Sequence, residues 1–227
     1  MKSILLGLMM VIAVNALGQD KQPYTYVMED GTVLPASSLD SLNRAWGQGR
    51  VMLQHTAEDD KKGIMHVVKM SDAMMQLFLQ KATENKMKLM AMVGKPAPAF
   101  SLKDMSGKSW TLDQLKGRVV VLNFWFTSCP PCIAEMPDLN GLVHQYPPAK
   151  VVFLALTFND ADQVKKFLET HVFDYTILPS SGEVDKSYAI SSWPASFVIG
   201  KGGKILLAAE SGPELVKQVK STIDKEL

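Results

Sequence analysis

The pattern of hydrophobic and polar residues changes character part-way along the chain. Beyond a glycine and proline cluster at residues 94–98, two stretches, residues 119–126 and 151–158, are almost continuously apolar. Such runs are typical of strands buried on both faces beneath helices. Before the cluster the pattern is mixed. We therefore predict two units, residues 19–92 and 93–227.

The second unit is predicted to be an α/β domain. The expected order is strand 119–126, helix 133–143, strand 151–158, a helix capped by Asn159 or Asp160, a short strand at 175–178, and a hairpin formed by 195–199 and 204–209. Ser211 and Glu214 form a capping box that would open a last helix. We expect a central sheet, part parallel with an antiparallel edge, covered by helices on both faces.

The first unit is predicted to be a small α+β domain. It would contain an extended segment at 24–33, a short helix capped by Ser37 or Ser38, strands 51–57 and 64–70 joined by a polar hairpin loop, and a helix capped by Ser71. The last helix carries a stripe made of Met74, Met75, Phe78 and Ala82. No motif here indicates chemistry, so we expect the unit to select or position partners, or only to cover apolar surface.

The N-terminus predicts a cleaved secretory signal. Lys2 precedes eleven apolar residues, 4–14, and Ala16-Leu17-Gly18 places small residues where signal peptidase cuts. The alternative is a membrane anchor, but eleven residues rise only about 16 Å as a helix, against a hydrocarbon core of about 30 Å. Gln19 stands where a lipoprotein would carry its lipid-bearing cysteine, which argues against a lipid anchor. We expect an exported, periplasmic protein after removal of residues 1–18.

Composition excludes some functions. The 227 residues contain 24 Lys and Arg and 23 Asp and Glu, for a net charge of +1, with no basic block. Nucleic-acid binding is therefore not expected. Fourteen methionines raise copper binding as an alternative, especially at Met87, Met90 and Met92, but most methionines lie on apolar stripes as core fillers.

The candidate chemistry is a CxxC motif, Cys129-Pro130-Pro131-Cys132, which holds the chain's two cysteines. It follows a buried strand and opens a helix, where unpaired backbone N–H groups stabilise a thiolate over a thiol. Proline is tolerated there because its missing N–H has no helical partner. We expect Cys129 to be the exposed nucleophile and Cys132 to be more buried and to resolve the mixed disulfide.

Three alternatives compete with a redox motif. A zinc site needs four ligands, and the four histidines show no paired spacing, so no metal or other cofactor is expected. A structural disulfide would close too small a loop to contribute much stability. A peroxidase would carry Thr or Ser three residues before its nucleophilic cysteine, where this chain has Phe126.

Residues 93–227 resemble the TlpA/ResA-type thioredoxin-fold thiol-disulfide oxidoreductases. The resemblance covers about three-fifths of the chain and rests on several ordered features: the segment 121–125 before CxxC, Pro137 in the following helix, the segment 193–197, Gly117, and the glycines of the late hairpin. Two positions depart from the family. Ser128 replaces the usual tryptophan before the first cysteine. Trp193 is larger than the usual residue, so we expect a substrate groove of a different shape.

The resemblance assigns roles to three further residues. Pro194 would be a cis-proline facing the two sulfurs, with the backbone of Trp193 pairing with the substrate chain; the alternative is a trans proline opening an edge strand. Glu135, three residues after Cys132, would exchange protons with a cysteine sulfur, because Asn123 stands where many thioredoxins have a buried aspartate. The alternative is an ordinary surface glutamate.

We therefore predict an exported oxidoreductase that exchanges a Cys129–Cys132 disulfide with protein thiols and disulfides. The resemblance favours a reductant supplied by a membrane thiol transporter, with cytochrome c maturation as the family's familiar setting. A redox-inert binding or assembly module, and an oxidase or isomerase of protein disulfides, remain alternatives. The sequence predicts no oligomeric state.

Overall fold

The computed structural model describes residues 24–227, apart from the side chains of Ala57, Asp60 and Lys61. The predicted signal peptide and Gln19 lie outside these residues. The described chain divides into two compact units between Gln80 and Lys81, within helix α3 (Asp72–Met90). The first unit therefore ends inside that helix, and the second begins with the helix's last turns.

The first unit is built on a four-stranded sheet. Its elements are β1 (Thr25–Met28), β2 (Val33–Leu34), α1 (Ser38–Trp46), β3 (Val51–Gln54), α2 (Ala57–Lys62) and β4 (Ile64–Lys69). The strand order is β2-β1-β4-β3, in which β1 and β4 are parallel and the other pairs antiparallel. Strands β3 and β4 pair as predicted, but a helix, not a simple hairpin loop, joins them. One hydrophobic cluster, which includes Tyr26, Leu39 and Val67, forms the core.

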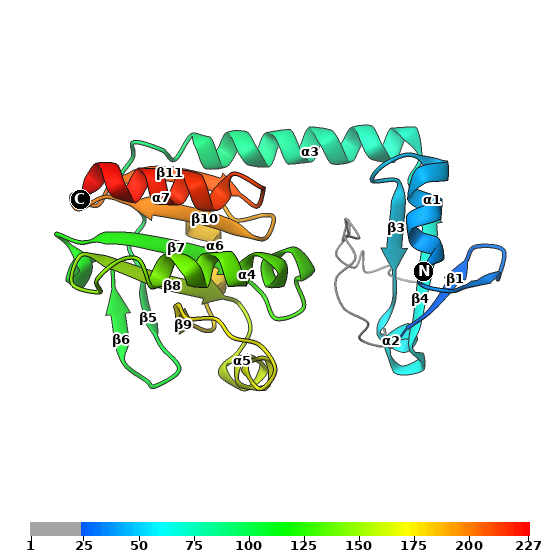
Figure 1. Cartoon of the computed structure of the whole chain (residues 1–227), viewed down its shortest axis with the longest axis horizontal. Coiled ribbons are helices and arrows are strands. Elements are labelled where there is room, and N and C mark those ends of the chain that lie inside the picture. The colour runs from blue at the N-terminus through cyan, green and yellow to red at the C-terminus, as the bar shows by residue number, and fades with distance from the viewer. Residues whose placement is uncertain (1–23) are drawn as a thin grey trace. The chain divides into compact units, whose positions relative to one another are not determined.

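The second unit contains a five-stranded sheet (Figure 1). Its elements are β5 (Ser101–Lys103), β6 (Ser109–Thr111), the short 3-10 helix η1 (Asp113–Leu115), β7 (Val119–Trp125), α4 (Pro130–Val143), β8 (Val151–Thr157), α5 (Ala161–Leu168), β9 (Thr176–Leu178), α6 (Gly182–Ser187), β10 (Ala195–Ile199), β11 (Ile205–Glu210) and α7 (Leu215–Glu226). The order of the large sheet is β11-β10-β7-β8-β9. Strands β7, β8 and β9 are parallel, whereas β10 and β11 are antiparallel, as predicted. Strands β5 and β6 form a separate hairpin.

Both faces of the large sheet are buried. Val119, Val121 and Trp125 of β7 pack on one face with α4 and α7, and the alternate residues Val120 and Leu122 pack on the other face with α6. This alternation is the pleat of a strand in which both sets of side chains are apolar. The prediction of a sheet covered on both faces is confirmed.

The start of α7 differs from the expectation. The capping box predicted from Ser211 and Glu214 does not form: Glu214 is the N-cap residue and makes no side-chain capping hydrogen bond. The hydroxyl of Ser211 instead donates to Glu135 of α4. A competing acceptor from another element therefore takes the hydroxyl that the local sequence assigned to the helix.

Candidate functional site

A disulfide joins Cys129 and Cys132 at the N-terminus of α4. Cys129 is the N-cap residue with extended backbone angles, and prolines occupy the first positions of the helix. The backbone N–H of Cys132 donates to the Sγ atom of Cys129 at 3.3 Å. A sulfur that accepts a hydrogen bond at the positive end of a helix is placed where negative charge on it is stabilised.

Both cysteines are buried in this oxidised form, so the expectation of an exposed Cys129 is wrong. Cys129 is 2% exposed and Cys132 is 1% exposed, although Ser128 and Pro130 beside Cys129 are exposed. The Cys129 side chain belongs to a hydrophobic cluster that includes Phe126, with Trp193 packed against it. A hydrophobic cluster drawn from several elements thus buries a side chain that the local sequence alone would leave open.

The loop before Cys129 is held by Asn159, which follows the neighbouring strand β8. The backbone N–H of Thr127 donates to Oδ1 of Asn159 at 2.9 Å, and the Thr157 hydroxyl donates to the same oxygen at 3.1 Å. The sequence assigned Asn159 or Asp160 to a helix cap, and Asp160 alone forms that capping box, with Gln163. The sequence did hold a signal for this contact: residues 127 and 159 follow two adjacent parallel strands, and the carboxyl ends of such strands lie at the same end of the sheet.

Pro194 lies directly before β10, and the Trp193–Pro194 peptide bond is cis, as the resemblance implied. Register pairs Ala195 with Phe124 of β7, which brings this segment beside the strand that leads into CxxC. Pro194 is buried, and Trp193 is partly exposed. The segment that carries both residues therefore borders the disulfide-bearing loop.

Three aromatic rings form a cluster at this border: Phe126, Phe158 and Trp193. The ring of Trp193 meets those of Phe126 and Phe158 at centroid distances of 5.8 and 5.4 Å, and Phe126 and Phe158 stack at 5.4 Å. Phe158 is 43% exposed. Sequence reasoning missed Phe126 and Phe158 as neighbours of the site, because their contact depends on the alignment of β7, β8 and the segment before β10.

Glu135 is partly buried on α4 and is not an ordinary surface glutamate. The Ser211 hydroxyl donates to its Oε2 atom at 2.8 Å, and the Asn123 side-chain amide donates to Oε1 at 3.0 Å. Burial raises the pKa of Glu135 to about 7, although both hydrogen bonds act to lower it. A carboxyl with this pKa changes its protonation state near neutral pH, which suits general acid–base work.

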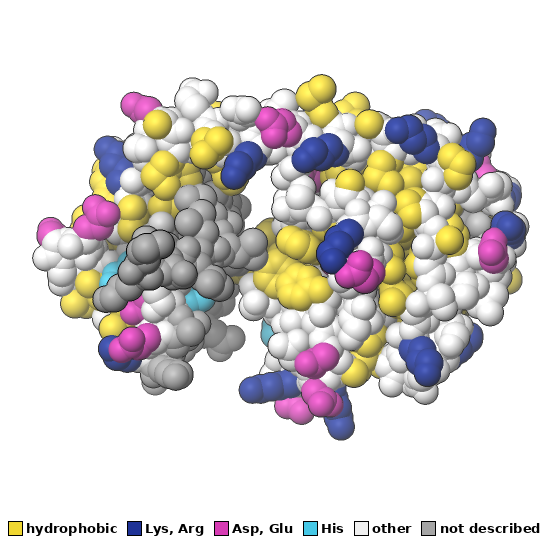
Figure 2. Space-filling view, turned by 180° about the vertical axis from the view of Figure 1, so that it is seen from behind, with side chains coloured by type: hydrophobic (Ala, Val, Ile, Leu, Met, Phe, Trp, Pro, Cys, Tyr) yellow, Lys and Arg dark blue, Asp and Glu magenta, His cyan; other side chains and the backbone are white. Residues whose placement is uncertain are grey.

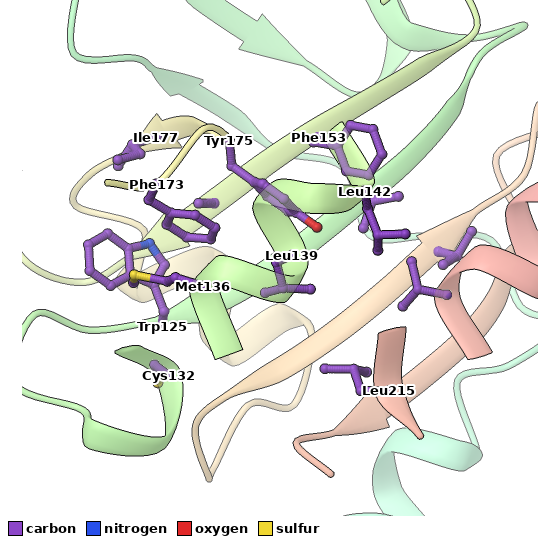
Figure 3. Close-up of a cluster of buried hydrophobic side chains, with 14 of the residues drawn as sticks. Trp125, Cys132, Met136, Leu139, Leu142, Phe153, Phe173, Tyr175, Ile177 and Leu215 are labelled. Atoms are coloured by element: carbon purple, nitrogen blue, oxygen red, sulfur yellow. The ribbon is translucent and has the colours of Figure 1, made fainter. Parts of the chain in front are cut away.

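Tyr175 is the ionisable neighbour of Glu135 from across the core. Its hydroxyl is buried without a hydrogen-bond partner, and burial followed by the charge of Glu135 raises its pKa above the ordinary range. In Figure 3 the side chain of Tyr175 points inward near Leu139 of α4, and Cys132 lies at the N-terminal end of that helix. Tyr175 is therefore uncharged wherever Glu135 titrates.

Among residues 24–227, no three His, Cys, Asp or Glu side chains are grouped so that they could hold a metal ion. Within the same residues no helix combines the length and apolar character needed to cross a membrane. The structure thus brings together a disulfide at the start of α4, a carboxyl with a raised pKa on that helix, and the cis-proline segment that precedes β10.

A redox-active cysteine pair at the start of a helix, on a thioredoxin-like sheet, defines the thiol-disulfide oxidoreductases, which need no cofactor beyond that pair. Residues 93–208, just over half of the chain, match the AhpC/TSA family, and the chain belongs to it.

Relatives agree with this class. The thiol-disulfide oxidoreductase ResA of Bacillus thuringiensis subsp. konkukian is 38% identical over 116 residues, 50% of this chain and 67% of that protein. The thioredoxin-like protein YneN of Bacillus subtilis is 35% identical over 49% of this chain and 68% of its own length. A crystal structure described as a thiol:disulfide interchange protein DsbE from Chlorobium tepidum aligns with a TM-score of 0.55 and 26% identity, over 59% of this chain and 96% of that chain.

Proposed function

We propose that the protein is an exported reductant of protein disulfides, in which Cys129 attacks first. The observation that carries this proposal is the position of Cys129 as N-cap of α4, with its Sγ accepting from the Cys132 N–H. The thiolate of Cys129 attacks one sulfur of a partner's disulfide, and the other sulfur leaves and takes up a proton. Cys132 then attacks Sγ of Cys129, the partner's second sulfur leaves as a thiol, and the Cys129–Cys132 disulfide remains.

Glu135 serves the second step by accepting the proton of the Cys132 thiol. It lies one helical turn beyond Cys132, and its pKa of about 7 leaves a useful fraction ionised at neutral pH. Asn123 cannot replace it, because an amide has no titratable proton.

Pro194 and Trp193 bind the partner chain. Trp193 precedes the buried end of β10 and joins the aromatic cluster with Phe126 and Phe158, of which Phe158 is the most exposed. An apolar side chain beside the partner's cysteine would pack on these rings, while the backbone of the partner chain pairs with the backbone of Trp193. Access of a partner to Cys129, which is buried in the oxidised form, would require movement of the side chains packed around it.

The reducing direction rests on the resemblance to the TlpA/ResA type. It needs an electron supply, for which a membrane thiol transporter is the proposed donor. Maturation of exported cytochromes c is one setting for such a reductant. Residues 1–18 would direct export to the periplasm and be removed, and residues 19–92 would select or position partners for the thioredoxin-like domain. Sequencing the N-terminus of protein recovered from the exporting cell tests the cleavage.

The test of direction is the equilibrium reduction potential against glutathione, combined with turnover of a simple protein disulfide. A value near the thioredoxin end, about −270 mV, supports the reductant, and a value near about −120 mV identifies an oxidant. A wild-type protein that neither reduces nor oxidises any dithiol substrate would instead be a redox-inert binding module.

A further inference from the structure

The carboxyl of Glu135 is held by two donors of different kinds from different parts of the fold. Asn123 of β7 donates to Oε1, and Ser211, the residue after β11, donates to Oε2. Asn123 is itself fixed, because its amide also donates to the Ser196 hydroxyl at 3.1 Å and the two residues are register partners in β7 and β10. Ser211 is exposed and lies in the connection to α7.

The two donors respond differently to the proton that Glu135 carries. A side-chain N–H of asparagine only donates, so Oε1 remains an acceptor in both protonation states. A serine hydroxyl can donate to a carboxylate or accept from a carboxylic acid. The proton of neutral Glu135 therefore resides on Oε2, where Ser211 can accept it in a hydrogen bond.

We propose that Ser211 is a positioning residue: its hydroxyl holds Oε2 of Glu135 in both protonation states, more strongly in the carboxylate than in the acid, and so sets the pH at which Glu135 serves disulfide exchange. This inference rests on the proposed role of Glu135. The pKa of Glu135 is set by three causes, burial and the hydrogen bonds from Ser211 and Asn123, and none of them is a charged neighbour. The buried Tyr175 is neutral in this range, and Glu210, next to Ser211, accepts a hydrogen bond from Ser192. On α4 itself, both cysteines are tied in the disulfide.

The test is the Ser211→Ala variant of the full-length oxidised protein. The Glu135 carboxyl is followed by carbon-13 NMR through a pH titration and is assigned from its loss in Glu135→Gln. Removing a donor that favours the ionised form moves the midpoint upward, by roughly one pH unit for one hydrogen bond to a carboxylate. Ser211→Thr, which keeps a hydroxyl, restores the wild-type midpoint, and the pH–rate profile with a small disulfide shifts in parallel in Ser211→Ala.

Ser106→Ala is the matched control. Ser106 donates to Asp104 at 2.6 Å in the β5–β6 hairpin, so this variant also removes a serine–carboxylate hydrogen bond but should leave Glu135 unchanged. An unmoved Glu135 midpoint in Ser211→Ala overturns the role of Ser211 whatever the rates show. If the midpoint moves while Ser211→Ala and Glu135→Gln both keep the wild-type pH–rate profile, the proton step of the proposed function fails, and Ser211 has no part in exchange.

Discussion

The two units of the chain differ in how many hydrophobic layers their sheets support. The first has a single cluster whose buried members are Tyr26, Leu39, Val51, Leu53 and Val67. The large sheet of the second unit has an apolar cluster on each face, and the disulfide lies at the edge of one of them. A reactive group held to sub-ångström geometry needs rigid support from several elements. This comparison places the cysteine pair in the better supported second unit, whereas recognition of partners is the role proposed for the first.

Helix α3 shows the same contrast within one element. Leu89, in its last turn, is 4% exposed and packs into the second unit's core, whereas Leu77 and Leu79 are 52% and 50% exposed. Figure 2 shows hydrophobic side chains at the surface along this helix. The predicted stripe of Met74, Met75 and Phe78 is only half-buried.

The largest effect should come from the cysteines, because the comparison assigns all redox chemistry to them. Cys129→Ser should abolish exchange, and Cys132→Ser should trap partners as stable mixed disulfides on Cys129, since the resolving thiol is lost. Non-reducing gels after reaction with a protein disulfide measure both outcomes. The double variant is the control for non-specific capture, and equal trapping by the two single variants would reject the order of attack.

Removing the first unit should separate recognition from chemistry. A truncated protein that begins at Lys81 retains Leu89 and the whole site, so it should reduce a small generic disulfide at the full-length rate. Combined with Cys132→Ser, it should capture a different set of native partners, which mass spectrometry of the trapped species identifies. A folded truncated protein that cannot reduce the small disulfide, or that captures the same partners as the full-length Cys132→Ser trap, contradicts this division.

The sequence predicted what local patterns determine. The continuous apolar runs gave β7 and β8, and the glycine-rich turn gave the β10–β11 hairpin. Helix α2 was missed although its signal is local: Thr56 and Asp59 form a capping pair in which Asp59 accepts from the Thr56 N–H at 2.9 Å.

The site was predictable only in part, for a physical reason. Cys129, Cys132 and Glu135 share one helix, so their spacing is visible in the sequence. The contacts of Ser211 with Glu135 and of Asn159 with Thr127 join residues 76 and 32 positions apart. The burial of Cys129 likewise depends on a hydrophobic cluster whose members come from several elements. These features follow from strand register and loop paths, which residue patterns do not encode.

Truncating Leu89 should sharpen the contrast along α3. Leu89→Ala leaves a cavity in a packed core and should lower the free energy of unfolding by about 3 kcal/mol. Leu77→Ala removes the same atoms from an exposed position of the same helix and should change it by less than about 0.5 kcal/mol. Chemical denaturation of the oxidised full-length variants measures both, and similar losses at the two positions would contradict the placement of the buried part of α3. For the same reason, a truncated protein that begins at Ala91 should be less stable than one that begins at Lys81.

The smallest predicted effect is on the free energy of unfolding, and it comes from the ionisation of the partly buried Glu135 carboxyl in the second unit. The pKa of Glu135 in the folded protein, about 7, lies above the ordinary value of 4.5 for a glutamate, so the folded state binds this proton more tightly than the unfolded chain does. Ionisation therefore destabilises the fold: the penalty is absent below about pH 4.5, grows up to about pH 7 and is complete above it.

Glu135→Gln avoids the charge and keeps an acceptor for Asn123, so it should stabilise the oxidised protein at pH 8 by at most about 3 kcal/mol and have little effect at pH 4. Thermal unfolding at the two pH values measures this difference. Asp138→Asn, an exposed carboxylate on the same helix, is the control, and an equal effect of Glu135→Gln at both pH values would show that the carboxyl is not buried at this cost.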